Sequence, residues 1–157
     1  MKKLLLTACA VLVLAGCGSS TKEDAKKMTC KMSQEANGMT VETSIDFTYS
    51  GNDISRQDQK VVMTAKDEKT YEAMKPVIEG ASLESKAKGV EGFTYELKFD
   101  DKKFTVNEHM DFDLNAMSPK DYGSFTNQKL EGDSLKGLVK LDMTKENMEK
   151  SGLTCTE

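Results

Sequence analysis

Sulfur-containing side chains are the first candidates for chemistry in this sequence of 157 residues. Met28, Cys30 and Met32 occupy alternate positions, so on a strand their sulfurs project from one face. Soft thioether and thiolate ligands select Cu(I). The competing interpretation is structural, because methionine is a common gap-filler in protein cores and Cys30 can form a disulfide. A Cu(I)-binding module is therefore an alternative that ranks below the structural interpretation.

Two polar features match known sites only in part. Residues 111–115 begin like a calcium-binding loop, but Ala116 stands where glycine is needed and Tyr122 where a bidentate glutamate is needed. His109 is the only histidine, and we expect it to be an exposed strand residue and not a ligand or base. The sequence lacks the phosphate-loop, serine-hydrolase, zinc-protease and dinucleotide fingerprints. We therefore predict no catalytic residues, no metal site and no cofactor, and hence a protein that is not an enzyme.

Length and charge limit the function classes further. A chain of this length suits one folded domain. There are 26 acidic and 22 basic residues, which gives a formal net charge of −4. Phosphate binding depends on an excess of Lys and Arg, so we expect no nucleic-acid partner.

The N-terminus has the three-part layout of an export signal. Lys2 and Lys3 precede an apolar run over residues 4–14, and the small residues Ala15 and Gly16 follow. A helix of that length rises about 16 Å, roughly half of a ~30 Å hydrocarbon core, so it cannot span a bilayer alone. We predict a signal peptide over residues 1–16.

The end of this signal, Leu14-Ala15-Gly16-Cys17, resembles the lipobox of bacterial lipoproteins. The resemblance implies that the Cys17 thiol carries a diacylglyceryl group and that Cys17 becomes the mature N-terminus. Two acyl chains give a lasting anchor, whereas one chain is marginal. The alternative is an ordinary secretory signal with an incidental cysteine.

A lipid on Cys17 makes the membrane the expected partner and sets the location. We expect the extracytoplasmic face: the outer face of the cytoplasmic membrane in a Gram-positive host, or the outer membrane in a Gram-negative one. Residues 17–27 are small, polar and charged after the cysteine, and are predicted to be the lipidated residue and a flexible tether. A single domain over residues 28–157 follows.

The remaining cysteines allow one pairing. Cys9 leaves with the signal and Cys17 is used for the lipid, which leaves Cys30 and Cys155. The exported side of a membrane usually permits oxidation, so we predict a Cys30–Cys155 disulfide. It closes a loop of about 125 residues, for which the chain-entropy description gives about 4–5 kcal/mol of stabilisation. The alternative is a pair of reduced thiols, but no neighbouring histidine or Cys-x-x-Cys spacing activates them.

Apolar and polar residues alternate along the domain as they do in β-hairpins. Residues 39–49 place Met39, Val41, Ile45, Phe47 and Tyr49 on one face, a turn follows at 50–53, and a second strand runs over 54–64. Residues 90–114 repeat the pattern around a turn at 100–103. Because two-stranded hairpins need cover for their apolar faces, we expect an α+β domain: an antiparallel sheet built from hairpins, with helices packed on one face.

The helical segments are less clearly delimited. Residues 64–67 have capping-box spacing with Thr64 as N-cap, and Tyr71, Met74 and Ile78 then recur at helical spacing. Pro76 either kinks this helix or begins a second one. Towards the C-terminus we expect a loop over 118–137 with one helical turn at 119–122, a short strand over 138–141, a helix over 144–151 with Thr144 as N-cap, and a last strand over 153–156.

The order of these features is similar to that of a known family. A lipobox and a cysteine after the tether precede Thr-Val-Glu-Thr at 40–43 and Thr-Tyr-Ser-Gly-Asn at 48–52. Gly-Val-Glu-Gly-Phe-Thr-Tyr follows at 89–95, and Ser-Gly-Leu-Thr-Cys at 151–155. This resembles the YehR-like family of small bacterial lipoproteins, a domain of unknown function, over about residues 28–157. The resemblance implies an α+β lipoprotein domain and brings no activity or site residues.

The function expected from the sequence is therefore a non-enzymatic one. We expect a lipid-anchored extracytoplasmic domain that binds a protein or small molecule not identified by the sequence, or that supports an envelope assembly. The second hypothesis is a small-ligand carrier with a pocket between sheet and helices. The pocket would be lined by the aromatic residues Phe93, Tyr95, Phe99, Phe104 and Phe112. A Cu(I)-binding module and an enzyme rank last.

Overall fold

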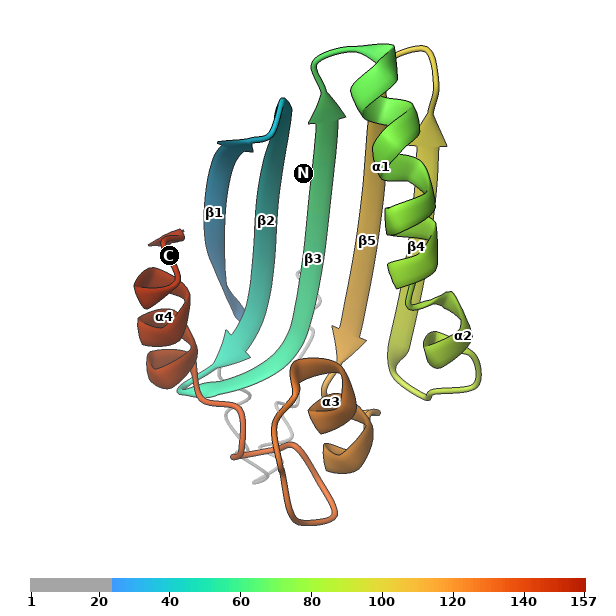
Figure 1. Cartoon of the computed structure of the whole chain (residues 1–157). Helices are drawn as coiled ribbons and strands as arrows, with labels where there is room; N and C mark the ends of the chain where they lie inside the picture. Colours follow the sequence, from blue (N-terminus) through green and yellow to red (C-terminus); the bar gives the residue numbers. More distant parts are fainter. Residues whose placement is uncertain (1–23) are drawn as a thin grey trace, which may run out of the picture.

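A six-stranded antiparallel sheet organises residues 24–157, the part of the chain that the structure describes. In this computed structural model the strand order is β4-β5-β3-β2-β1-β6. The helices lie over one face of the sheet (Figure 1). The predicted α+β class is confirmed, with its antiparallel hairpins and its helices on one face. The predicted signal peptide (1–16), Cys17 and tether residues 18–23 lie outside the described residues.

The elements have the following bounds along the chain. They are β1 (Lys26–Ala36), β2 (Met39–Ser50), β3 (Asp53–Ala65), α1 (Glu68–Ala81), α2 (Glu84–Ala87), β4 (Phe93–Asp100), β5 (Thr105–Asp113), α3 (Pro119–Thr126), α4 (Leu141–Lys150) and β6 (Thr154–Thr156).

The first hairpin joins β1 to β2 through Asn37 and Gly38, which have φ of +53° and +77°. Asn-Gly is the pair that a two-residue hairpin turn with positive φ at both positions prefers. β1 begins at Lys26 and so includes Lys26 and Lys27, which the sequence analysis placed in the tether, because these residues already pair with Tyr49 and Thr48 of β2. Within the described residues the tether therefore reaches only residue 25.

The two hairpins predicted from alternation are confirmed. In β2, Ile45, Phe47 and Tyr49 are buried, and the turn at Gly51 leads into β3. β2 and β3 form the first of the two predicted hairpins, and β4 and β5 form the other. The structure also pairs β3 with β5, which joins both hairpins into one sheet. The apolar residues of the alternating segments therefore lie on one inward face of the sheet, which is continuous across the strands.

Helix α1 begins one turn later than the capping-box spacing predicts. The N-cap is Asp67, whose side chain accepts a hydrogen bond from the Thr70 N–H, so the expectation that Thr64 is the N-cap is wrong. β3 continues through Thr64, because Thr64 pairs with Thr40 and Thr105. The helix passes through Pro76 to Ala81, so no second helix begins at Pro76.

The C-terminal third differs most from the sequence-based expectation. α3 is a full helix of two turns, not one turn in a loop. Residues 138–141 are not a strand: only one isolated bridge joins Lys140 to Asp53, and α4 already begins at Leu141, three residues before the predicted N-cap Thr144. The last strand is confirmed as β6, which pairs with β1.

The front face of the sheet, which the helices cover, holds two apolar clusters. The smaller one packs Tyr71 and Met74 of α1 against Ala65 and Val106. The larger one joins strands β1 to β5 to α3 and to the C-terminal segment, and includes Phe47, Phe112, Tyr122 and Leu135. Among residues 24–157, no helix combines the length and apolar character needed to cross a bilayer.

The approach of β4 to the end of β5 leads to a stability prediction. Gly92 has a φ of +76°, and a Cβ there would lie 2.7 Å from the Asp113 carbonyl oxygen and 2.8 Å from the Met117 nitrogen. Because backbone atoms cannot move aside easily, Gly92→Ala is expected to destabilise the fold by about 1–3 kcal/mol. Gly80→Ala is the matched control: Gly80 lies in α1 with nothing within 4 Å, so alanine should stabilise by about 0.5–1 kcal/mol. Urea unfolding measures both, and equal effects would contradict this explanation.

Candidate functional site

A cavity of about 550 Å³ lies between the front face of the sheet and the C-terminal helices. Its floor comes from β3 and β5, and its walls come from α3, α4 and the segment that joins them. In Figure 1 this segment runs below the sheet from α3, at the lower end of β5, to α4, beside β1. The cavity lies where the cover of the sheet is incomplete.

The floor combines two carboxamides with two apolar side chains. Gln57 pairs with Phe112 across the β3–β5 ladder, and Gln59 pairs with Met110. All four point to the front face, because they share the parity of the buried residues on these strands. Two glutamines thus lie among mainly apolar side chains on this face, which also carries Glu108 of β5.

Gln57 is the one buried polar or charged residue of residues 24–157, with 8% of its surface exposed. Its Oε1 accepts a hydrogen bond from the Tyr122 hydroxyl at 3.3 Å, and its Nε2 donates to Gln59 Oε1 at 3.5 Å. Burial raises the pKa of Tyr122, so its hydroxyl keeps its proton and remains a donor. Both contacts are long, which leaves the carboxamide only weakly engaged.

The α3 wall is set by its two ends. Ser118 caps the N-terminus by accepting from the Asp121 N–H at 3.1 Å, and Pro119 occupies the first turn. Asn127 ends the helix with a φ of +54°. The chain then turns back so tightly that a Cβ at Gly123 would lie 2.3 Å from the Gln128 carbonyl oxygen. α3 is therefore held as a short, rigid unit.

Aromatic packing holds α3 on the sheet. The ring of Phe125 lies 4.1 Å from that of Phe93 and 6.1 Å from that of Phe112, centroid to centroid, and Tyr122 meets Phe112 edge-on at 5.8 Å. Such offset and edge contacts are favourable beyond the area that they bury. Tyr122, Phe125 and Phe112 also line the cavity, so the contacts that hold α3 shape its wall.

The α4 wall is positioned by a distant turn. The Leu141 N–H donates to the Asn52 carbonyl at 2.9 Å, and the Asp142 N–H donates to Asn52 Oδ1 at 3.1 Å. Asn52 lies in the β2–β3 turn and so satisfies backbone donors at the start of α4 that its own N-cap, Lys140, does not. At the other end, the Leu153 N–H donates to the Met148 carbonyl.

The charge in the described cavity lining is balanced by an ion pair with a residue outside it. Lys140 is its one charged side chain among the described residues, and its ammonium lies 2.6 Å from Asp53 Oδ1. No aspartate, glutamate, histidine or cysteine of residues 24–157 lines the cavity. The remaining polar groups are carboxamides and hydroxyls, beside methionine, leucine, valine and aromatic side chains.

The mouth of the cavity exposes apolar side chains. In the described part of the chain the exposed large hydrophobic residues are Val77, Leu138 and Met143, and the last two line this cavity. Leu138 is 41% exposed and Met143 is 61% exposed. Val77 lies elsewhere, on α1.

The aromatic residues predicted to line a pocket are mostly elsewhere. Of Phe93, Tyr95, Phe99, Phe104 and Phe112, only Phe112 lines the cavity. Phe93 packs behind it, Tyr95 donates to Glu108 at 2.9 Å, and Phe99 and Phe104 pack against the cluster under α1. The lining residues from β3, α3 and α4 were not predicted, because these segments come together only in the folded chain.

Cys30 and Cys155 face each other across the β1–β6 ladder. Their sulfurs are 2.02 Å apart and form a disulfide in this structure. Cys30 is fully buried beside Met28, and Met32 packs on the rim of the same cluster. A disulfide sulfur is not a thiolate, so Cys30 as placed here is not available as a Cu(I) ligand.

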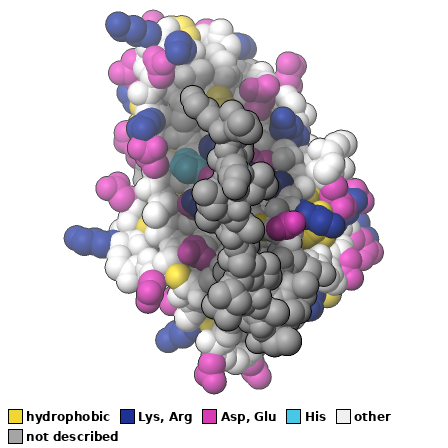
Figure 2. Space-filling model, turned by 180° about the vertical axis from the view of Figure 1, so that it is seen from behind, with side chains coloured by type: hydrophobic (Ala, Val, Ile, Leu, Met, Phe, Trp, Pro, Cys, Tyr) yellow, Lys and Arg dark blue, Asp and Glu magenta, His cyan; other side chains and the backbone are white. Residues whose placement is uncertain are grey.

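The parts of the back face that are visible in Figure 2 carry charged side chains and the histidine. His109 Nε2 lies 3.1 Å from Asp58 Oδ2, with 36% of the histidine side chain exposed. Burial raises the pKa of Asp58, but hydrogen bonds from His109 and Lys60 lower it more, so the net shift is downward. Asp111 pairs with Arg56 and does not belong to a calcium loop. No cluster of three or more metal-ligating side chains occurs within residues 24–157.

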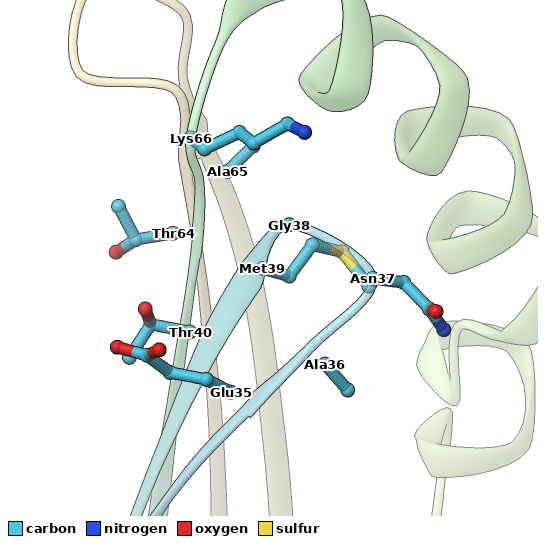
Figure 3. A pocket seen from close by; sticks show the side chains of 9 residues that line it. All are labelled: Glu35, Ala36, Asn37, Gly38, Met39, Thr40, Thr64, Ala65 and Lys66. Carbon is cyan, nitrogen blue, oxygen red and sulfur yellow. The ribbon is translucent and has the colours of Figure 1, made fainter.

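A second hollow, of about 420 Å³, lies at the tip of the β1–β2 hairpin (Figure 3). Its residues come from both faces of the sheet: Glu35, Thr40 and Thr64 point to one side, and Ala65 and Lys66 to the other. The hollow therefore wraps around a strand end and is not an enclosed site. The Lys66 side chain covers Gly38, and the Lys66 N–H donates to the Gly38 carbonyl at 2.9 Å, which explains the hollow as turn packing.

Comparison with known proteins now places the chain. It belongs to the family described as "Protein of unknown function (DUF1307)", which matches residues 28–154. The fold is similar to an NMR structure of a protein from Streptococcus pneumoniae TIGR4, at 19% identity and a TM-score of 0.54, over 99% of this chain and 96% of that one. It is also similar to the NMR structure of the E. coli YehR protein, at 17% identity and a TM-score of 0.57, over 84% of this chain and 92% of that one.

These comparisons confirm the predicted YehR-like domain of unknown function. At these identities the solved structures support the fold alone. Among curated proteins, no significant match was found.

The disulfide joins β6, the strand that follows α4, to β1, which leads to a prediction. Cys30→Ser with Cys155→Ser is expected to lower the free energy of unfolding by about 4–5 kcal/mol, because the bond closes a very long loop. Urea unfolding of the two proteins measures the loss. Reductant should produce the same loss in the natural chain and no further loss in the double variant. An unchanged unfolding midpoint on reduction would rule out a stabilising bond.

Proposed function

We propose that this protein is a lipid-anchored extracytoplasmic lipoprotein whose domain binds a small ligand, without catalysis, in the cavity between the sheet, α3 and α4. The observation that carries the binding proposal is the mouth of the cavity. Two of the three exposed large hydrophobic residues in the described part of the chain, Leu138 and Met143, are gathered there. Exposed apolar side chains around a concave site are typical of ligand binding.

The size and lining of the cavity support the same proposal. Its volume of about 550 Å³ falls within the range of small-molecule sites. Three methionines, Met110, Met143 and Met148, line it. Methionine side chains adapt to ligands of varied shape. The lining therefore combines apolar side chains with polar side chains in similar number.

The absence of reactive groups supports binding over catalysis. The described lining has no carboxylate, imidazole or thiol to act as a base or nucleophile. The Lys140 ammonium is paired with Asp53, and the Tyr122 hydroxyl is held in its protonated form by burial. We therefore propose that the ligand leaves chemically unchanged.

The anchor proposal rests on the sequence Leu14-Ala15-Gly16-Cys17 behind an apolar run. The folded domain begins at Lys26, so few residues separate it from the proposed lipid on Cys17. An envelope-accessory function that needs no small ligand is the second candidate, because a lipid anchor serves it equally well.

The anchor is tested by a substitution at the lipidated residue. Cys17→Ala is expected to release the processed protein from membranes into the medium or periplasm, because no diacylglyceryl group can be attached. Cell fractionation with immunodetection measures this. Cys9→Ala is the matched control within the signal and should leave the protein on the membrane. A processed Cys17→Ala protein that stays membrane-bound would refute the anchor.

The binding site is tested with toluene, an apolar probe that makes no hydrogen bonds. The full chain is isolated from membranes, placed in lipid nanodiscs and labelled with ¹³C at its methionine methyl groups. Toluene should shift the methyl signals of Met110, Met143 and Met148 saturably. It should leave the signal of Met74, a buried residue of α1, unchanged.

Two variants control this measurement. Thr144→Phe should fill the cavity and weaken the shifts at least tenfold, whereas Glu149→Phe adds the same ring outside the lining and should leave them unchanged. The Met74 signal reports whether each variant is folded. A natural chain that shows no saturable shift at the three methyl groups contradicts the proposal.

A further inference from the structure

We infer that the cavity selects an uncharged ligand that carries a primary carboxamide on an apolar body, the class of N-acylated amino acid amides and N-capped short peptide amides. This inference rests on the proposed function, because it assumes that the cavity binds a small ligand. It adds the chemistry by which the ligand is recognised.

The charge balance of the cavity lining excludes charged ligands from the inferred class. Among the described lining residues the one charged group, Lys140, is already neutralised by Asp53 at 2.6 Å. A bound carboxylate or ammonium would lose its hydration and find no free opposite charge, which is costly. A neutral polar group avoids this loss.

Gln57 supplies the recognition element at the floor. A primary carboxamide has two N–H donors and two acceptor lone pairs. Its contacts with Tyr122 and Gln59 use one acceptor site at 3.3 Å and one donor at 3.5 Å. One donor and one acceptor site remain on a side chain that is only 8% exposed. This holds whichever way the amide is turned, because both orientations present an oxygen and a nitrogen.

An amide is the group that satisfies this pair. A primary amide presents its carbonyl oxygen and the N–H that is cis to it side by side, so it can form two parallel hydrogen bonds with the Gln57 carboxamide. A ligand with only an acceptor or only a donor would leave a buried group unpaired, which is where hydrogen-bonding sites gain their selectivity.

The other lining groups fit such a ligand. Gln59, Gln128 and Asn147 add carboxamides from β3, from the segment after α3 and from α4. Phe112, Tyr122 and Phe125 offer faces for an apolar or aromatic body. A plain acyl chain fits less well, because it would cover these carboxamides without pairing them.

The experiment compares matched probes on the full chain in lipid nanodiscs at pH 6, with the methionine methyl signals as readout. N-acetyl-L-phenylalaninamide is neutral, N-acetyl-L-phenylalanine is an anion, and L-phenylalaninamide is a cation. All three share one aromatic body. The neutral probe is expected to bind at least tenfold more tightly than either charged probe.

A variant separates the amide contact from the apolar one. Gln57→Leu should weaken binding of the neutral amide at least tenfold relative to the binding of toluene, with the Met74 signal as the check of folding. If toluene binds but the charged probes bind as tightly as the neutral one, or folded Gln57→Leu keeps its affinity for the amide, the inference is wrong and the binding site stands. If toluene does not bind the natural chain, the proposed function itself fails. The comparison of the three probes on the natural chain decides the matter even if the variant does not fold.

Discussion

The rest of the structure depends on one constraint: the apolar face of a six-stranded sheet must be covered by short helices. α1 covers one part closely, with Tyr71 and Met74 packed on Ala65 and Val106. α3 and α4 pack at the other part, and a cavity remains between them and Gln57 and Gln59. A close apolar cover there would bury two carboxamides without partners, which costs free energy. The two inward-facing glutamines therefore account for both the cavity and its polar floor.

The positions of the covering helices are set by contacts far apart in the chain. α4 is capped by Asn52 from the β2–β3 turn, and the chain after it returns to the sheet as β6 beside β1. The Cys30–Cys155 disulfide closes this return. α3 is held by the packing of Phe125 on Phe93 and Phe112. Both walls are thus tied to the sheet and only indirectly to each other, an arrangement that keeps the space between them open.

Local sequence patterns were sufficient to predict the hairpins, whereas long-range contacts determine the start of α4 and the cavity. The alternation that ends in Ile45, Phe47 and Tyr49 predicts β2 and its inward face, because strand periodicity is local. The start of α4 escaped prediction, because its backbone is satisfied by Asn52 and not by a nearby Ser or Thr. The cavity escaped for a similar reason: its floor and walls come from segments that meet only in the folded chain. One signal was available, since Gln57 and Gln59 share the parity of Val61 and so mark polar residues on an inward face.

Intermolecular nuclear Overhauser effects show whether this cavity is a ligand site. With toluene bound to the full chain in nanodiscs, we expect contacts from the ring protons of toluene to Phe112, Tyr122 and Met148, on the floor and both walls. Val77 on α1 is the competing apolar position, being 69% exposed. Contacts to Val77 without contacts to the three cavity residues would mean that the cavity is not the ligand site.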